Sequence, residues 1–262
     1  QNNTLTSCEG PQTTITITVN ALPVAPTATT TIDYCEDDAA VALSATASSG
    51  HTLVWYGSDG TTVLSGAPTP STSSAGTTNY YVAQNATLTD CEGPKTTITV
   101  TVSGTPVAPT VSDVSYCNNE TATALTATAS TGNTLVWYDA SQTGITTPTP
   151  STSSVGSVTY YVAQQTASGC EGPKSLVTVT INALPVAPTA TTAIAYCKDA
   201  TATALTATAS GSHTLVWYDT DGTTVLSGAP TPSTSSVGTT TYYVAQNNTL
   251  TSCEGPQTTI TI

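Results

Sequence analysis

The residues that recur along this chain and could do covalent chemistry are its cysteines. All seven form two series, with one member of each series in every complete repeat. The first series is Cys35, Cys117 and Cys197, and the second is Cys8, Cys91, Cys170 and Cys253. Fixed spacing of this kind is typical of a disulfide framework in an oxidising, exported location. No Cys-x-x-Cys pair occurs, so a zinc site is not expected.

Two disulfide pairings are consistent with this spacing. Pairing within repeats gives Cys35–Cys91, Cys117–Cys170 and Cys197–Cys253, with roughly 3–4 kcal/mol of stabilisation per loop. Pairing between neighbouring repeats gives Cys35–Cys170 and Cys117–Cys253. A strand from Pro26 to Cys35 would cover about 30 Å at ~3.3 Å per residue. A disulfide requires Cα atoms within about 7 Å, so the topology favours pairing between repeats, although both models remain open.

Other candidate sites are weaker. Asp219 and Asp221 place carboxylates at alternate positions before a glycine, as oxygen-rich calcium loops do, although an ordinary β-turn is the favoured explanation. The histidines His51 and His213 have no counterpart in the middle repeat, where Asn133 stands, and no acid or nucleophile recurs beside them. We therefore expect no catalytic residue, no enzyme activity and no cofactor other than a possible calcium ion.

The three tryptophans mark a repeat of about 80 residues. Trp55, Trp137 and Trp217 are 82 and 80 residues apart, and a proline-rich segment such as Ala-Leu-Pro-Val-Ala-Pro opens each copy. Because proline fixes φ, these segments predict stiff domain junctions. The expected parts are the end of a preceding repeat at 1–20 and repeats at 21–103, 104–182 and 183–262. Residues 1–17 recur unchanged at 246–262, which indicates a larger unit of 245 residues.

Within each repeat the hydrophobic period is two, as in β-strands. Apolar and threonine residues alternate along 97–102, and further strands are expected at 124–129, 135–138 and 159–163. About seven short strands in about 80 residues predict an all-β fold of tandem immunoglobulin-like β-sandwiches in an extended rod. The Leu-Val-Trp-Tyr segment falls where strand C would bury its tryptophan, so Trp55, Trp137 and Trp217 are predicted core residues.

Composition excludes several partners. The net charge is -13, with three lysines and no arginine, so a surface for nucleic acid or anionic membranes cannot be assembled. No apolar run is long enough for direct membrane insertion. The chain begins at Gln1 in the middle of its own repeat pattern, so we expect it to be a piece of a longer protein.

The order of motifs resembles the immunoglobulin-like tandem repeats of Bacteroidota surface proteins. These motifs are Tyr-Cys, Ala-Leu-Thr-Ala-Thr-Ala-Ser, Leu-Val-Trp-Tyr, Pro-Thr-Pro-Ser-Thr-Ser, Tyr-Tyr-Val and Cys-Glu-Gly-Pro. Such repeats occur in very large adhesins exported by the type 9 secretion system, including gliding adhesins of the SprB type. The resemblance implies an extracellular, outer membrane-associated location and a role in adhesion or gliding motility.

The leading functional hypothesis is therefore a stalk or filament segment that extends and presents an adhesive region. Its partners would be neighbouring repeats of the same chain, with surface glycans or other cell-surface proteins as further candidates. Two alternatives are an array of glycan-binding modules that uses exposed tryptophans, and a self-assembling extracellular fibre whose sheet edges carry few charges. Solvent exposure of the three tryptophans separates the stalk hypothesis from the glycan-binding one.

Overall fold

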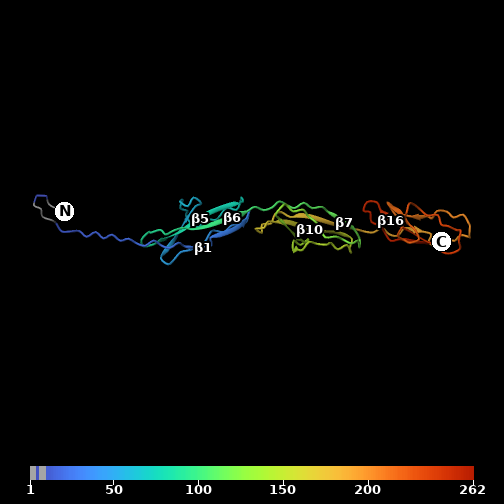
Figure 1. Ribbon diagram of the computed structural model, residues 1–262, viewed down its shortest axis with the longest axis horizontal. Helices are drawn as coiled ribbons and strands as arrows, with labels where there is room; N and C mark the ends of the chain where they lie inside the picture. The colour runs from blue at the N-terminus through green and yellow to red at the C-terminus, as the bar shows by residue number, and fades with distance from the viewer. Residues whose placement is uncertain (1–3, 6–9) are drawn as a thin grey trace. The chain divides into compact units, whose positions relative to one another are not determined.

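A computed structural model describes residues 4–5 and 10–262, in two compact units, Gln1–Thr105 and Pro106–Ile262. All regular elements of the described residues are β-strands, which confirms the all-β prediction. Figure 1 shows these strands gathered into one β-rich body per repeat. In the part of the chain that the structure describes, no helix is long and apolar enough to cross a membrane.

The first unit contains one repeat, whose main sheet has four strands. Their spatial order is β2 (Thr31–Cys35), β6 (Thr96–Ser103), β5 (Gly76–Ala86) and β4 (His51–Tyr56). The second layer contains the short pair β1 (Thr27–Ala28) and β3 (Ala45–Thr46). β2 runs parallel to β6, and all other pairs are antiparallel.

The second unit contains two further repeats of similar design, in the last of which a single parallel bridge, Ala193 to Thr261, stands in place of the parallel edge strand. The sheet of the middle repeat has the order β7 (Val114–Cys117), β11 (Ser175–Asn182), β10 (Gly156–Gln165), β8 (Thr134–Tyr138) and β9 (Gly144–Ile145). In the last repeat the order is β15 (Val225–Leu226), β14 (His213–Tyr218), β16 (Thr241–Asn248) and β17 (Thr258–Thr261). The pair β12 (Thr189–Ala190) and β13 (Ala207–Thr208) lies opposite.

Each repeat has a separate hydrophobic core built around its tryptophan. In the middle repeat, buried Trp137 on β8 lies in register with Val162 on β10 and packs with Leu125. Val177, Val179 and Ile181 alternate along β11 and are all buried, as the period of two predicts. Trp55 and Trp217 occupy the equivalent places in the other two cores. The predicted core role of all three tryptophans agrees with their burial.

The strand expected at 124–129 is not formed. Only a single bridge, Thr110 to Thr128, is present there. The amide of Leu125 instead donates to the carbonyl oxygen of Pro148, at 2.9 Å. Because proline has no N–H to return the bond, this pairing cannot extend into a ladder. The prediction was wrong here because it judged the segment without its proline-rich neighbour.

The two cysteine series lie at opposite ends of a repeat. In the first repeat, Cys35 is paired with Ser103, the last residue of β6, whereas Cys91 precedes the start of β6. An eight-residue strand spans roughly 25 Å at ~3.3 Å per residue. We call the end that carries Cys91, Cys170 or Cys253 the entry pole, and the end that carries Cys35, Cys117 or Cys197 the exit pole. The two cysteines of one repeat are therefore too far apart to bond.

The predicted tail of a preceding repeat, residues 1–20, falls partly outside the described residues, as does Cys8. Residues 10–20 form no strand, and Ile15 is 83% exposed. Ile260, which occupies the same place in the identical segment 246–262, is fully buried on β17. The same sequence therefore forms a strand where a sandwich offers it partners.

Candidate functional site: the junctions between domains

The proline segment that opens each repeat is anchored to its own sandwich at two carbonyl groups. In the last repeat, the Val186 carbonyl accepts a hydrogen bond from Gln246 at 2.6 Å, and the Pro188 carbonyl accepts one from the Thr258 hydroxyl at 2.5 Å. The same two bonds occur in the other repeats, at Val24 and Pro26 and at Val107 and Pro109. The junction segment is therefore part of the domain that follows it.

A buried glutamine holds this segment against the turn that precedes the tryptophan strand, β8 in the middle repeat. Gln164 on β10 is 1% exposed; its amide nitrogen donates to the Val107 carbonyl at 2.8 Å, and its oxygen accepts the Ser130 amide at 2.5 Å. Gln84 and Gln246 are fully buried and do the same in the other repeats. Because both polar ends are satisfied, burial of this side chain stabilises one arrangement of the two segments.

The glycine of each Cys-Glu-Gly-Pro motif lies directly against the junction segment. A Cβ atom on Gly255 would lie 2.3 Å from the Pro185 carbonyl oxygen, and one on Gly172 would lie 1.9 Å from the Pro106 carbonyl oxygen. Both distances are far below van der Waals contact, and backbone atoms cannot move aside without shifting the strand. Glycine is required here by close packing with the proline segment.

The glutamate of the same motif accepts a hydrogen bond from the tyrosine of Leu-Val-Trp-Tyr. In the last repeat the Tyr218 hydroxyl donates to Glu254 at 2.5 Å, and Tyr56 and Tyr138 donate to Glu92 and Glu171 in the others. Burial, followed by the hydrogen bond to glutamate and its negative charge, raises the pKa of these tyrosines to about 12. The motif glutamate therefore has a defined partner inside its own domain.

Lysine covers this tyrosine in the first two repeats. Lys95 Nζ lies 3.4 Å from the ring centroid of Tyr56, and Lys174 Nζ lies 3.4 Å from that of Tyr138. This arrangement is a cation–π contact. In the last repeat Gln257 stands at the lysine position and donates to the Gly222 carbonyl at 3.0 Å. Two of the three lysines of the chain thus make cation–π contacts at the entry poles.

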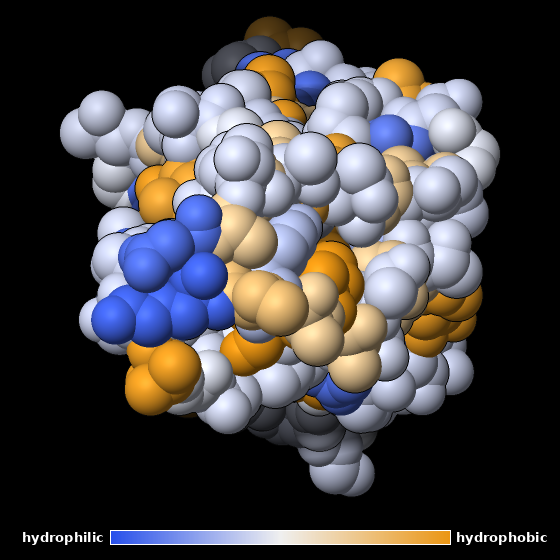
Figure 2. Space-filling model, turned by 90° about the vertical axis from the view of Figure 1, so that its right-hand side faces the viewer, coloured by the Kyte–Doolittle hydropathy of each residue, from blue (hydrophilic) through white to orange (hydrophobic). Residues whose placement is uncertain are grey.

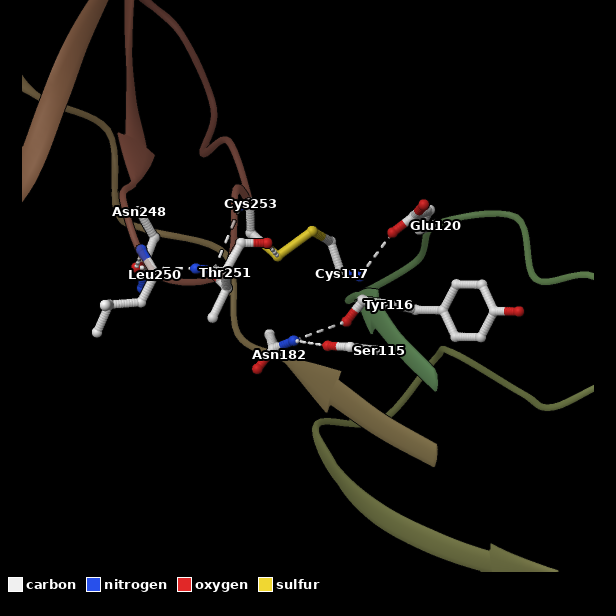
Figure 3. The surroundings of a disulfide bond; sticks show 9 residues. All are labelled: Ser115, Tyr116, Cys117, Glu120, Asn182, Asn248, Leu250, Thr251 and Cys253. Carbon is white, nitrogen blue, oxygen red and sulfur yellow. Dashed lines mark hydrogen bonds between the residues drawn. A yellow bond between two sulfur atoms is a disulfide. The ribbon is translucent and has the colours of Figure 1, made fainter. Parts of the chain in front are cut away.

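In the last repeat, the cysteine of the motif connects the entry pole to the preceding domain. Cys253 of the last repeat is bonded to Cys117 of the middle repeat, with Cα atoms 5.5 Å apart, well within the normal range for a disulfide. Figure 3 shows the bond between the turn of residues 248–253 and the end of β7. Cys253 is fully buried. Next to it, the Asn182 side chain at the end of β11 donates to the Ser115 hydroxyl at 2.6 Å.

The bond Cys117–Cys253 belongs to the pairing between neighbouring repeats. Two of the pairs within repeats, Cys117–Cys170 and Cys197–Cys253, are wrong because Cys117 and Cys253 bond each other. The third, Cys35–Cys91, is wrong because Cys91 is a free thiol. Cys35 and Cys170 are both disulfide-bonded, and Cys197 is free. The separation of the two poles explains why pairing within a repeat fails.

The calcium candidates lie in the turn after β14. Asp221 accepts the amides of Thr223 at 2.9 Å and Thr224 at 2.8 Å, and also the Thr224 hydroxyl at 2.5 Å. These bonds, the hydroxyl bond foremost, hold the pKa of the Asp221 carboxyl well below its usual range. Asp219 accepts the amide of Thr220 at 2.7 Å. The turn explains both carboxylates, and calcium binding there stays a prediction.

Sequence reasoning missed the glutamine and glycine contacts. A signal for the glutamine was available, because Tyr-Tyr-Val-Ala-Gln recurs in every repeat. In a strand of period two, Gln84 falls on the same face as buried Val82. A polar residue that recurs on an apolar face indicates a satisfied, buried hydrogen-bond partner. The motif glycine also recurs in every repeat, but its recurrence does not reveal the contact that requires it, because the contacting segment lies about 70 residues away.

These features together define a tandem array of immunoglobulin-like β-sandwich domains, in which each proline segment packs on the domain that follows it. The chain belongs to the family of the CHU_C-associated Ig-like domain, whose model matches residues 23–103, 106–183 and 185–262. Disulfide-bonded domains of this class are typical of extracellular proteins and are structural modules that typically lack enzyme activity. No curated protein sequence matches the chain.

Several solved structures of tandem domains are similar to this chain at low sequence identity. The I-band fragment I67-I69 from titin is 11% identical, with 90% of this chain and 95% of that chain covered and a TM-score of 0.36. The FN1-FN3 domains of chicken CNTN1 are 16% identical, with 92% and 98% covered and a TM-score of 0.32. The fibronectin(III)-like modules of Clostridium thermocellum CbhA are 18% identical, with 62% and 92% covered and a TM-score of 0.34.

Proposed function

We propose that this chain is a stalk segment of a large cell-surface adhesin, which extends and presents an adhesive region for attachment or gliding. The disulfide between Cys117 and Cys253 is the observation that carries the proposal. It joins the exit pole of one domain to the entry pole of the next, so it restricts motion at the junction. A stalk needs this property, whereas a binding module gains little from it.

The proposal includes a second disulfide between successive domains, Cys35–Cys170, which we also call a staple. Both cysteines are disulfide-bonded, and they hold the positions in repeats one and two that Cys117 and Cys253 hold in repeats two and three. Export through the type 9 secretion system and anchoring at the outer membrane follow from the resemblance to Bacteroidota repeats, and the disulfides are consistent with an oxidising location.

The alternative of a glycan-binding array has lost its main support. Trp55, Trp137 and Trp217 are only 5%, 3% and 6% exposed, so their indole rings offer no stacking surface to a sugar. Three residues that recur in every repeat, the buried glutamine and the motif glutamate and glycine, have contacts within their own domain, which supports the stalk over the glycan-binding array.

An attachment assay on cells that produce the full-length protein tests the proposal. Deleting residues 18–262 in frame removes one 245-residue period, and we expect unchanged surface display but reduced attachment. Restoring the period with Cys117→Ser and Cys253→Ser should recover attachment at rest but less of it under flow. If excess purified chain blocks attachment by itself, the segment is a binding module and the proposal is wrong.

A further inference from the structure

The two free thiols of the described residues lie at equivalent places to the two bonded ones. Cys197 occupies the exit pole of the last repeat, as Cys117 does in the middle repeat, and Cys91 occupies the entry pole of the first repeat, as Cys253 does in the last. Each is more exposed than its bonded counterpart: Cys197 is exposed where Cys117 is half-buried, and Cys91 is half-buried where Cys253 is buried.

The turn that carries Cys197 has the same conformation as the bonded turn. Asp199, two residues beyond the cysteine, has a φ of 61°, and Asn119 in the bonded turn has a φ of 63°. The Asp199 amide donates to the Thr234 carbonyl at 2.9 Å, and the Asn119 amide donates to the Thr152 carbonyl at the same distance. The exit pole of the last repeat thus shares this turn with the bonded pole, although Cys117 ends the paired strand β7 and Cys197 lies in no strand.

A hollow of about 440 Å³ lies beside Cys197 at this pole, lined among others by Ile194, Tyr196, Val237 and Ile262. Figure 2 looks onto this end of the chain and shows mostly pale, uncharged residues with several hydrophobic ones and a strongly hydrophilic group to one side. At the exit pole of the middle repeat, the hollow beside Cys117 is lined also by Thr251 and Ser252, from the turn of the following domain. The occupant expected beside Cys197 is the equivalent turn.

The sequence period identifies which copy of that turn fits. Residues 246–262 repeat residues 1–17, so after Ile262 a continuing array would proceed from residue 18 and would next form a copy of the first repeat. The entry-pole cysteine of that copy is Cys91. A continuing array would therefore bring the two thiols that are free in this chain to the two sides of one junction.

We propose that Cys197 of one 245-residue unit forms a disulfide with Cys91 of the following unit, so that every junction along the array is stapled. This goes beyond the proposed function because it names a covalent partner for both free thiols. Oxidised glutathione serves as the oxidant: the Cys197 thiolate attacks it and releases one glutathione, and the Cys91 thiolate then displaces the second. Two thiols and one glutathione disulfide thus give one protein disulfide and two glutathione molecules.

A tandem chain tests this pairing directly. Residues 18–262 are appended after Ile262, and the chain is folded in a glutathione redox buffer, alkylated without reduction, and cleaved after every lysine and glutamate. This cleavage places every cysteine of one unit on its own peptide, with Cys91 on 37–92, Cys197 on 175–198 and Cys253 on 199–254. We expect a disulfide between peptides 175–198 and 37–92; because the two units yield identical peptides, a substitution in one unit assigns the bond.

The matched control is Cys197→Ser in the first unit. It should abolish the bond between peptides 175–198 and 37–92, while the Cys117–Cys253 peptide persists and reports that the domains are folded. The proposal is overturned if the unsubstituted tandem chain retains that peptide but leaves Cys197 of the first unit and Cys91 of the second alkylated. A bond from either of them to any other cysteine overturns it equally.

Discussion

Cys117 and Cys253 belong to successive domains and are 136 residues apart in sequence, yet their Cα atoms lie 5.5 Å apart across a disulfide. The bond closes a loop that contains the junction segment and most of two domains. Neither cysteine belongs to a tryptophan core, so each sandwich has its own source of stability. The disulfide therefore acts mainly on how the two domains are held together.

Thiol labelling without reduction should modify Cys197 faster than Cys91, because Cys197 is exposed and Cys91 is half-buried. Cys117 and Cys253 should react only after reduction. Mass spectrometry of chain treated with iodoacetamide over time gives both rates. Labelling of Cys253 in unreduced, folded chain would contradict the disulfide assignment.

Replacing the buried glutamine should weaken one domain selectively. Gln164→Ala leaves the Val107 carbonyl and the Ser130 amide without their partner, which we expect to cost about 2–4 kcal/mol in the stability of the middle repeat. Hydrogen exchange of peptides from 106–182, with 185–262 as the internal reference, measures this.

The control for that substitution is the next residue along β10. Gln165→Ala removes only a peripheral bond of 3.2 Å to the Gly169 carbonyl and should change stability by less than about 0.5 kcal/mol. Equal losses of stability for the two variants would show that the buried hydrogen bonds of Gln164 contribute no more than the exposed bond of Gln165.

Substitution of the motif glycine tests how closely the proline segment packs against the Cys-Glu-Gly-Pro motif. Gly255→Ala places a Cβ against the Pro185 carbonyl and should cost about 1–3 kcal/mol in the last repeat, with slower formation of the Cys117–Cys253 bond during refolding. Gly228→Ala has open space around its Cβ and should be neutral. Hydrogen exchange and timed alkylation report on the two effects, and similar behaviour of both variants would argue against close packing at the junction.

Alkaline pH should destabilise the last repeat through Tyr218. Its pKa is raised to about 12 in the folded domain, whereas a tyrosine in an unfolded chain loses its proton near pH 10. The contribution is therefore fully present below about pH 10 and is lost as the pH rises towards 12.

The matched variant is Tyr218→Phe, which lacks the titrating hydroxyl. Its domain should be less stable at neutral pH, because Glu254 loses its donor, but it should lose less of its remaining stability above about pH 10. Thermal melts over that range measure the difference. Parallel alkaline losses in both chains would rule out Tyr218 as the group responsible.

Patterns in the sequence predicted strands and hydrophobic cores of this molecule. The alternation along 97–102 gave β6, and the spacing of the tryptophans located three cores. Strand direction and length alone placed Cys35 and Cys91 at opposite poles. In contrast, the loss of the strand at 124–129 depends on Pro148, and the need for Gly255 depends on Pro185, both distant in sequence. Such contacts are set by tertiary packing, which periodicity does not encode.

Pulling single chains by their ends tests most directly whether successive domains are stapled together. In a chain with Cys35→Ser and Cys170→Ser, the bond Cys117–Cys253 should hide the 136 residues between its cysteines from extension. Adding a reductant should then lengthen the fully unravelled chain by about 450 Å, at ~3.3–3.6 Å per residue. A further Cys117→Ser substitution should abolish this gain. No gain, or a gain of only about 200 Å, as a bond within one domain from Cys197 to Cys253 would give, would contradict the stapled junction.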